Sequence, residues 1–531
     1  MKLTIERIID LVDQLTKDKL YDYVSGGDNK AKLIGVNKSE QYVEIARVNA
    51  DGTEKTSNMT KETLLKLCSK VVSNKPFKFD SVLDGGGNAR STFEAIFAHT
   101  TEFYACKVGR VKHLIWVPQM PHEVEKIFDY DTIKDHMHEQ GLDSSATINP
   151  AFRSYITAIK SKPFLLLAGI SGTGKSRIVR ELARACWDAD GDEFNAQKPR
   201  NFEIVQVKPN WHDSSELIGY VSRVSGEPVF VAGDFLKFVA KAWAEPDVPY
   251  FLCLDEMNLA PVEQYFAEYL SVVESRKADA DGNITTDPIL KKSQEDWYRI
   301  LTSELTEDGT DVRQRFLNDG ICIPQNLIVV GTVNMDETTF SFSRKVLDRA
   351  MTIEMNEVDL MGGLTERHEQ IGRLGQAELI GSAVEGVDVY SAHKEVCDKA
   401  IKYLQKVNDE LEGTPFKIAY RTRNEFLLYV VNNLPYNKDA AGSELSQEFV
   451  IARALDEITN MKILSRIEGD ETKVSKSFLN TLMETVSKGL QDISGLEYSG
   501  KEEEGKTYSI SLAKLSEMDK RLESGYTSFW S

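Results

Sequence analysis

One eight-residue segment constrains the fold of this chain more than any other. Residues 169–176 read Gly-Ile-Ser-Gly-Thr-Gly-Lys-Ser, and they join an apolar run to a segment with helical periodicity. Glycines between a strand and a helix let backbone N–H groups turn toward phosphate oxygens, above the positive end of the helix. The lysine can neutralise β- and γ-phosphate oxygens, and the serine hydroxyl can hold Mg²⁺. The residues expected to bind a nucleotide here are Gly169, Gly172, Thr173, Gly174, Lys175 and Ser176.

Five short apolar runs alternate with longer amphipathic stretches in the middle of the chain. The runs are residues 163–169, 202–208, 250–256, 327–334 and 351–355. This alternation is typical of a parallel sheet with crossover helices, and each run is bulky enough to be a strand buried on both faces. We therefore predict an α/β domain with a five-stranded parallel sheet over about residues 151–360.

Two acidic residues end the third run. Asp255 and Glu256 stand at the tip of that predicted strand, eighty positions after Lys175 (255 − 175). An aspartate placed there can bind a magnesium ion together with Ser176, and a glutamate beside it can orient or deprotonate an attacking water. The combination favours nucleotide hydrolysis over nucleotide binding alone.

A further polar pair lies at the end of the fourth run. Asn334 and Asp336 lie in the sequence Gly-Thr-Val-Asn-Met-Asp-Glu. If this strand lies between the phosphate loop and the metal carboxylate, Asn334 can sense the γ-phosphate and position water, with Asp336 in support. The alternative is that Asn334 caps the turn into the next helix.

Two arginines, Arg344 and Arg349, precede the fifth run. Positive charge at this edge of the domain could reach a nucleotide held by a neighbouring subunit and stabilise transition-state charge. Arginine on a helix more often only covers its surface, so both interpretations remain open.

The chain of 531 residues is long enough for several domains around this core. Residues 1–150 open with an amphipathic helix and continue with strand-like alternation, which predicts a separate α+β domain and a linker helix. Residues 361–495 have helical periodicity and predict a lid subdomain, and residues 496–531 predict a polar loop and a tail helix. The aromatic ending, Phe529 and Trp530, could dock on a neighbour or pack back on its own domain.

Charge and composition restrict the partners and the compartment. The formal net charge is −19, of which residues 1–150 contribute −2, from 20 Lys and Arg against 22 Asp and Glu. This charge disfavours nonspecific coating of nucleic acid by the whole surface. The nearly neutral N-terminal part is the less repulsive candidate for a contact with DNA. No run approaches the ~18 apolar residues of a membrane span, and the acidic N-terminus is unlike a secretory signal. The six cysteines are widely spaced, as expected of reduced thiols, so we expect a cytoplasmic protein.

Together these motifs resemble the AAA+ superfamily, and specifically its McrB-type branch, the nucleotide-hydrolysing motor of modification-dependent restriction systems. The branch has a Met-Asn-x-x-Asp signature after the fourth strand, which here reads Val-Asn-Met-Asp over residues 333–336 with a shifted aspartate. The longer stretches that resemble the branch are residues 208–220, 255–275, 343–350, 420–430 and 456–470. The resemblance implies an AAA+ P-loop NTPase core with a C-terminal helical lid.

The resemblance also assigns roles to single residues. The catalytic set within one subunit would be Lys175, Ser176, Asp255, Glu256 and Asn334. Arg349 would act as an arginine finger on a neighbouring subunit, with Arg344 as the alternative. Arg421 would be a second sensor supplied by the lid, with Arg423 as the alternative. The substrate would be GTP or ATP with Mg²⁺, because the phosphate loop does not distinguish the bases.

Motors of this type form rings, commonly hexamers. In restriction and anti-phage defence they drive a separately encoded, McrC-like nuclease. Their N-terminal domain commonly recognises DNA, often through a modified base taken out of the stack. Candidate residues for such a pocket with a positive rim are Phe103, Tyr104, Trp116, Lys107, Arg110 and Lys112. Aromatic residues in a domain of this size are usually core, however, and a basic cluster of this size is usually solvated surface. The alternative for the whole chain is a MoxR-type AAA+ ATPase that remodels a protein partner and has no role with DNA.

Overall fold

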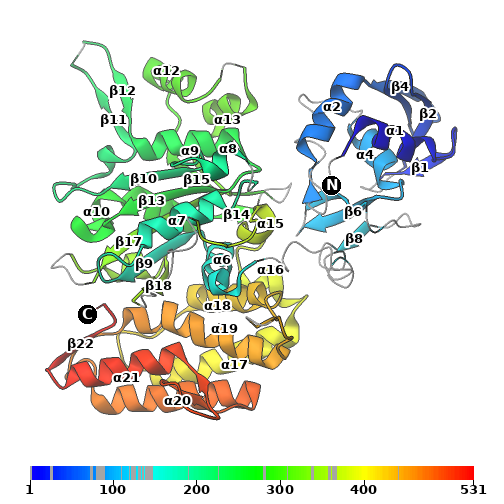
Figure 1. Ribbon diagram of the computed structural model, residues 1–531. Helices are drawn as coiled ribbons and strands as arrows, with labels where there is room; N and C mark the ends of the chain where they lie inside the picture. The colour runs from blue at the N-terminus through cyan, green and yellow to red at the C-terminus, as the bar shows by residue number, and fades with distance from the viewer. Residues whose placement is uncertain are drawn as a thin grey trace. The chain divides into compact units, whose positions relative to one another are not determined.

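The computed structural model describes residues 3–23, 28–71, 76–78, 90–108, 111–118, 120, 127–129, 133, 137, 148–188, 191–224, 226–278, 283–307, 309–335, 340–356, 360, 368–439 and 442–530 (Figure 1). The chain forms two compact units, Met1–Thr147 and Ile148–Ser531. Each unit has its own core and is described by itself.

The N-terminal unit is an α+β fold with two sheets, as predicted. Its first sheet is antiparallel, in the order β1 (Leu20–Asp22), β2 (Lys30–Asn37), β3 (Tyr42–Val48) and β4 (Glu54–Met59). The second has the order β5 (Pro76–Phe77), β7 (Val111–Trp116), β6 (Phe103–Val108) and β8 (Ile127–Asp129), with β6 and β8 parallel. Its helices are α1 (Ile5–Asp13), α2 (Lys61–Lys70) and α4 (Arg90–Ala98). The predicted opening helix is α1, which buries Ile5, Ile8, Ile9, Leu11 and Val12 on one face.

The second unit is built on the predicted five-stranded parallel sheet. The strands are β9 (Phe164–Gly169), β10 (Phe202–Gln206), β13 (Tyr250–Asp255), β17 (Leu327–Asn334) and β18 (Met351–Glu354). Their order is β10-β13-β17-β9-β18, and every pairing is parallel. The strand that ends at Asn334 therefore lies between the strand that enters the phosphate loop and the strand that ends at Asp255. This confirms the predicted fold class.

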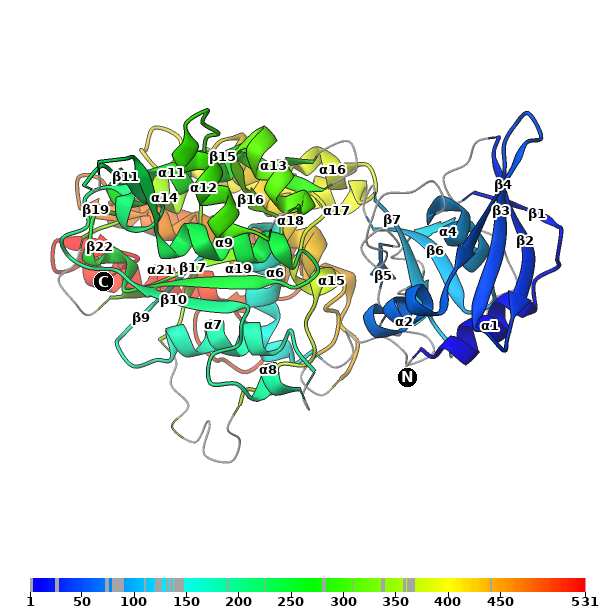
Figure 2. The same ribbon diagram turned by 90° about the horizontal axis from the view of Figure 1, so that it is seen from above.

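Helices cover both faces of this sheet. Leu165 and Leu167 of β9 pack in one apolar cluster with α7 (Lys175–Arg184), whereas Phe164 and Leu166 pack in another with α9 (Asp234–Ala244). Figure 2 shows α7 and α9 on opposite faces of the sheet. Because successive strand residues point to opposite faces, a strand buried on both sides has to be apolar throughout.

Three further groups of elements interrupt or border the sheet. A hairpin of β11 (Gly219–Ser222) and β12 (Val229–Ala232) precedes α9 and projects from the domain in Figure 1. Between β13 and β17 lie α10 (Val262–Tyr265), α11 (Ala267–Val272), the sheet β14 (Lys277–Ala278), β15 (Ile284–Leu290) and β16 (Ile321–Pro324), and the helices α12 (Asp296–Leu305) and α13 (Asp311–Asp319). The short helices α8 (Asp192–Asn195) and α14 (Arg344–Leu347) precede β10 and β18.

Residues beyond β18 form the helical lid. Its helices are α15 (Gln376–Leu379), α16 (Gly386–Tyr390), α17 (Lys394–Glu410), α18 (Tyr420–Asn433), α19 (Gln447–Lys462), α20 (Lys476–Ser494) and α21 (Ile510–Leu522). They pack on α6 (Arg153–Ser161) and on the β18 side of the sheet (Figure 1). The polar segment before α21 is a loop between the short strands β20 (Tyr498–Ser499) and β21 (Thr507–Tyr508).

The aromatic ending of the chain packs back on its own unit. Strand β22 (Tyr526–Ser528) pairs with β19 (Glu468–Asp470), and Phe529 is fully buried. The Trp530 ring lies 5.2 Å from that of Phe342, and its Nε1 donates to the Ser465 carbonyl at 2.8 Å. Of the two interpretations left open for this ending, packing within the unit is the one that the structure shows.

Candidate nucleotide-binding site

The phosphate loop occupies the turn from β9 to α7. Gly172 and Gly174 have φ values of +87° and +83°, in the left-handed region that side-chain-bearing residues rarely adopt. A Cβ on Gly169 would come within 2.3 Å of the Met355 carbonyl, because the end of β18 passes close to the loop. At these three predicted positions the backbone geometry therefore requires glycine. The loop that results leaves a row of backbone N–H groups exposed at the start of α7.

The Lys175 side chain folds back onto the backbone of this loop. It is only 6% exposed, and its Nζ donates to the carbonyls of Gly169 at 2.9 Å and Ile170 at 2.7 Å. The ammonium group is therefore held among the loop atoms that surround the expected phosphate position. A phosphate there would offer it a charged acceptor, which binds more strongly than a neutral carbonyl.

Asp255 and Ser176 meet beside the loop. The Ser176 hydroxyl donates to Asp255 Oδ1, and the Thr332 hydroxyl donates to the same oxygen at 2.8 Å. A hydroxyl and a carboxylate are hard oxygen ligands of the kind that Mg²⁺ takes next to nucleotide phosphates. These residues therefore fit a magnesium ion of the type predicted.

Thr332 is the residue of this group that the sequence interpretation missed. Besides its bond to Asp255, its Oγ1 accepts the backbone N–H of Glu256 at 2.9 Å. The available signal was a threonine inside an apolar strand, two positions before Asn334 and hence on the same face of β17. Thr332 therefore fixes both the Asp255 carboxylate and the backbone of Glu256.

Glu256 has a strained backbone. Its φ is +54°, a value that only Asp18 and Gln41 share among the non-glycine residues that the structure describes. Such a conformation costs about 1 kcal/mol and persists where the surroundings impose it. It brings the Glu256 carboxylate toward Asn334, whose Nδ2 donates to Oε1 at 3.3 Å. The Asn334 amide thus faces Glu256, and Asp336 lies outside the described residues.

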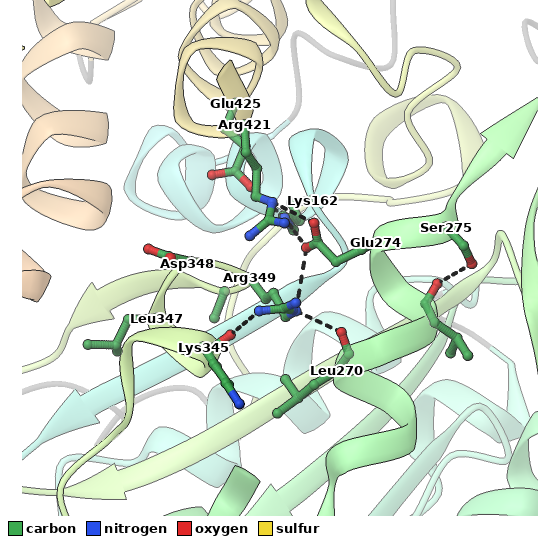
Figure 3. A network of polar contacts seen from close by, with 12 residues as sticks. Lys162, Leu270, Glu274, Ser275, Lys345, Leu347, Asp348, Arg349, Arg421 and Glu425 are labelled. Carbon is green, nitrogen blue, oxygen red and sulfur yellow. Dashed lines mark hydrogen bonds and ion pairs between the residues drawn. The ribbon is translucent and has the colours of Figure 1, made fainter. Parts of the chain in front are cut away.

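Arg349 lies at the opposite edge of the sheet. It comes two residues before Met351, which pairs with Leu165 near the start of β9, whereas the phosphate loop follows the end of β9. The six residues of β9 at ~3.3 Å each put about 20 Å between the two positions. Its Nε donates to the Leu270 carbonyl and its Nη1 to the Lys345 carbonyl, both at 2.7 Å (Figure 3). An arginine side chain cannot span this distance to its own phosphate loop.

Arg421 lies with Arg349 and away from the phosphate loop. Its Nε is 2.5 Å from Oε2 of Glu274, whose Oε1 is 3.8 Å from Arg349 Nε (Figure 3). The sequence interpretation grouped Arg421 with the nucleotide-binding residues, but the structure places it at the amino edge of the sheet. The reason is that α18 begins beside the segment after α11, a proximity that no sequence pattern reports.

The two alternative arginines are held by local contacts. Arg344 Nη1 donates to the Pro415 carbonyl at 2.6 Å, and its guanidinium lies 5.4 Å from the centre of the Phe416 ring. Arg423 donates to the Asn424 side chain at 2.9 Å and lies 5.0 Å from the centre of the Tyr420 ring. Arg344 therefore ties α14 to the lid.

The aromatic residues considered for a base pocket lie in the core of the N-terminal unit. The side chains of Phe103, Tyr104 and Trp116 are at most 4% exposed. The Tyr104 hydroxyl donates to the Met120 carbonyl at 2.8 Å, and Trp116 Nε1 donates to Glu102 Oε2 at 2.9 Å. They cannot stack on a base in this arrangement. Of the basic residues, Lys107 is exposed, Lys112 is half-buried and Arg110 lies outside the described residues.

Two features are absent from the part of the chain that the structure describes. No helix there is long and apolar enough to cross a membrane. No group of three or more His, Cys, Asp or Glu side chains there has the arrangement of a metal site. All six cysteines are free thiols, and five of them are buried.

Comparisons with known proteins match separate parts of the chain. Residues 164–317 match the model of the AAA domain (dynein-related subfamily), and residues 378–526 match a model described as a domain of unknown function. The type II restriction enzyme NmeDI of Neisseria meningitidis serogroup C is 32% identical over 145 residues, which are 25% of this chain and 40% of that enzyme. The chain thus spans less than half the length of this relative. With the order of the parallel strands and the geometry of the phosphate loop, the match of residues 164–317 supports an AAA+ ATPase domain in this chain.

Proposed function

We propose that this chain is the nucleotide-hydrolysing motor subunit of a McrB-type restriction or anti-phage complex. The observation that carries the hydrolytic part is the arrangement at the carboxyl edge of the sheet. There Ser176 meets Asp255 at the phosphate loop, and Glu256 faces Asn334 next to them. A site for binding alone would not need a strained glutamate beside the metal carboxylate.

In this proposal each residue has a distinct task. Lys175 leaves its loop carbonyls to bind β- and γ-phosphate oxygens, while Ser176 and Asp255 hold the magnesium ion. The chemistry that bound Mg²⁺ supplies there is neutralisation of charge on the transferred phosphate. Glu256 accepts the proton of the attacking water, and Asn334 holds the Glu256 carboxylate and the water in line.

Arg349 supplies charge to the nucleotide of a neighbouring subunit. Its position about 20 Å from its own phosphate loop supports action between subunits, because the side chain is too short to act within one. Arg421, beside it, would serve the same neighbouring nucleotide. Hydrolysis then needs a closed ring, for which we propose a hexamer.

The restriction context rests on sequence similarity. The relative is named as a type II restriction enzyme, and longer stretches of the chain, such as residues 255–275, resemble the McrB branch. We propose that the N-terminal unit recognises DNA and that the ring drives a separate, McrC-like nuclease. Recognition would use surface residues of that unit, since Phe103, Tyr104 and Trp116 are committed to its core.

Two observations favour the second candidate, a MoxR-type ATPase that remodels a protein. The three aromatic residues considered for base stacking in the N-terminal unit are buried, and residues 1–150 have a net charge of −2. A protein partner needs neither a stacking surface nor a positive rim.

Two measurements on the full chain separate the candidates. The first is steady-state hydrolysis of GTP and of ATP with Mg²⁺, with Glu256→Gln as the background. A preference for GTP supports the McrB-type motor, because remodellers of the MoxR type are expected to use ATP. The second is fluorescence anisotropy with unmodified and methylated duplex DNA at stated salt, since electrostatic binding depends on ionic strength. A chain that hydrolyses ATP and binds neither DNA contradicts the restriction role and leaves the remodeller.

A further inference from the structure

Glu274 lies between the two arginines at the amino edge of the sheet. It follows α11, and its carboxylate is 2.5 Å from Arg421 Nε, 3.8 Å from Arg349 Nε and 3.5 Å from Lys162 Nζ. Figure 3 shows the two guanidinium groups approaching this carboxylate from two sides. Neither arginine meets another carboxylate within ion-pair distance among the residues that the structure describes.

The surroundings of Glu274 carry excess positive charge. Ion pairs connect it through Lys162 to Glu425 and Lys462. The Arg466–Asp348 pair completes the cluster, because Lys462 Nζ donates to the Asp348 carbonyl at 3.1 Å. In the described part of the chain this cluster has five cations and three carboxylates, which are Lys162, Arg349, Arg421, Lys462, Arg466, Glu274, Glu425 and Asp348. Two positive charges are thus uncompensated in a chain whose overall charge is −19. A partly buried cationic excess of this kind is stabilised by an anionic group from outside.

The donors of both arginines are only partly used. A guanidinium has five N–H donors, and Arg349 uses Nε and Nη1 on backbone carbonyls, while Arg421 uses Nε on Glu274. Within the described residues, Nη2 of Arg349 and both Nη atoms of Arg421 donate no hydrogen bond. The side chain of Arg421 is 41% exposed and that of Arg349 is 20% exposed. The outer nitrogens of two adjacent guanidinium groups therefore remain available for phosphate oxygens.

We infer that Glu274 is a positioning residue for hydrolysis by the neighbouring subunit. Its carboxylate pairs with Arg421 Nε and attracts Arg349 from 3.8 Å, while the Leu270 and Lys345 carbonyls hold the inner nitrogens of Arg349. The outer nitrogens of both arginines then meet the γ-phosphate of the neighbour's nucleotide as a pair. The inference rests on the proposed action of Arg349 between subunits. It adds that a carboxylate of the same subunit sets the spacing of the arginine finger and the lid arginine. Such preorganisation matters because donors that are already in place need no rearrangement during the reaction.

A purely structural role for Glu274 gives a different result in experiments. If it only stabilised the fold, its removal would weaken nucleotide binding, assembly and thermal stability together. If it positions the two arginines, its removal leaves the phosphate loop of the same subunit intact. Only hydrolysis of the nucleotide bound by the neighbouring subunit is then lost. The two roles therefore separate in mixed rings.

The test uses the full-length variant Glu274→Gln, which keeps the shape of the side chain and removes its charge. We expect kcat for Mg²⁺-ATP or Mg²⁺-GTP to fall at least tenfold, while KM and the affinity for a fluorescent nucleotide change less than twofold. The matched control is Glu268→Gln on α11, where the glutamate is exposed, and it should match the wild type. Wild-type kcat in Glu274→Gln overturns the inference.

Mixing subunits supplies the decisive readout. Glu274→Gln subunits keep a working phosphate loop, and Glu256→Gln subunits keep working arginines, so a mixture should hydrolyse several-fold faster than either variant alone. The double variant Glu256→Gln/Glu274→Gln should give no such gain with Glu274→Gln. Absence of a gain overturns the inference if Arg349→Ala mixed with Glu256→Gln does regain activity. If that second mixture also fails, the proposed action between subunits is wrong and the inference falls with it.

A second variant covers the case in which Glu274→Gln does not fold. Glu274→Asp keeps the charge and draws the carboxylate back by one methylene. We expect it to assemble and bind nucleotide normally but to turn over more slowly than the wild type, with rescue in the same mixture. Full activity in Glu274→Asp would show that the spacing of the arginines is not set by this carboxylate.

Discussion

Glu425 of α18 and Lys462 of α19 form an ion pair of 2.8 Å in which neither side chain is more than 5% exposed. Lys462 Nζ also donates to the carbonyls of Leu347, Asp348 and Ala350, on either side of Arg349. Glu425 pairs in addition with Lys162, just before β9. The pair therefore fixes the lid to the segment that carries Arg349.

We predict that Glu425→Gln destabilises the attachment of the lid by about 3 kcal/mol at pH 7, because it leaves the charge of a fully buried lysine without its carboxylate. Thermal unfolding followed by calorimetry measures the change. Glu412→Gln, in an exposed ion pair with Lys417, is the control and should shift the unfolding temperature little. Equal shifts in the two variants would contradict a structural role for the buried pair.

The same variant has a predicted pH dependence. Burial alone would raise the pKa of Glu425, but the charges of Lys162 and Lys462 outweigh it and hold the pKa below the usual 4.5. Because the folded pKa is below the unfolded one, the stabilisation is present above about pH 4.5 and is lost as the pH falls through the folded pKa. The stability difference between wild type and Glu425→Gln should be full at pH 7 and smaller at pH 4.

Lys175→Ala should lower the affinity for nucleotide ~100-fold or more, since the ammonium contributes charge-assisted bonds to two phosphates. Isothermal titration calorimetry with ATP and GTP measures the loss. Lys237→Ala, an exposed lysine of α9, serves as the control. Unchanged nucleotide affinity in Lys175→Ala would remove this loop from the site.

Glu256→Gln should bind nucleotide with near wild-type affinity and lower kcat ~10²-fold or more, because a positioned general base is lost. Single-turnover hydrolysis separates this step from product release. Normal turnover would show that Glu256 takes no part in the chemistry.

Thr332→Val should lower kcat about tenfold with a smaller change in affinity. The substitution keeps the β-branched shape in β17 but removes the hydroxyl that links Asp255 to the backbone of Glu256. Thr332→Ser restores the hydroxyl and should recover most of the activity. If valine and serine behave alike, the hydroxyl is not what matters at this position.

Arg349→Ala should have little activity alone and regain part of it when mixed with Glu256→Gln, since each subunit supplies what the other lacks. Hydrolysis measured against the mixing ratio should peak at intermediate fractions. A mixture that only averages its components would argue that Arg349 acts within its own subunit or not at all. Arg344→Ala should not show this behaviour, because that side chain is bound to the lid through Pro415.

The sequence determined the central sheet because its signals are local. Each strand is a continuous apolar run, and the glycines with a lysine and a serine form one unbroken segment before α7, so periodicity and motif could be read without knowing any long-range contact. The residues at the carboxyl ends of β13 and β17 could be predicted to meet for the same reason, since parallel strands end at one edge.

Only the tertiary structure decided what joins segments far apart in the chain. Thr332 gains its role from Asp255, which lies on the neighbouring strand of the sheet. Glu274 gains its role from Arg421, which lies 147 positions later (421 − 274) at the start of a lid helix. The expected place of Arg421 at the phosphate loop, and the choice between core and surface for Trp116, depended in the same way on packing. The sequence determines periodicity and loop chemistry, which act over a few residues, whereas the partner of a buried charge is chosen by how helices and strands pack.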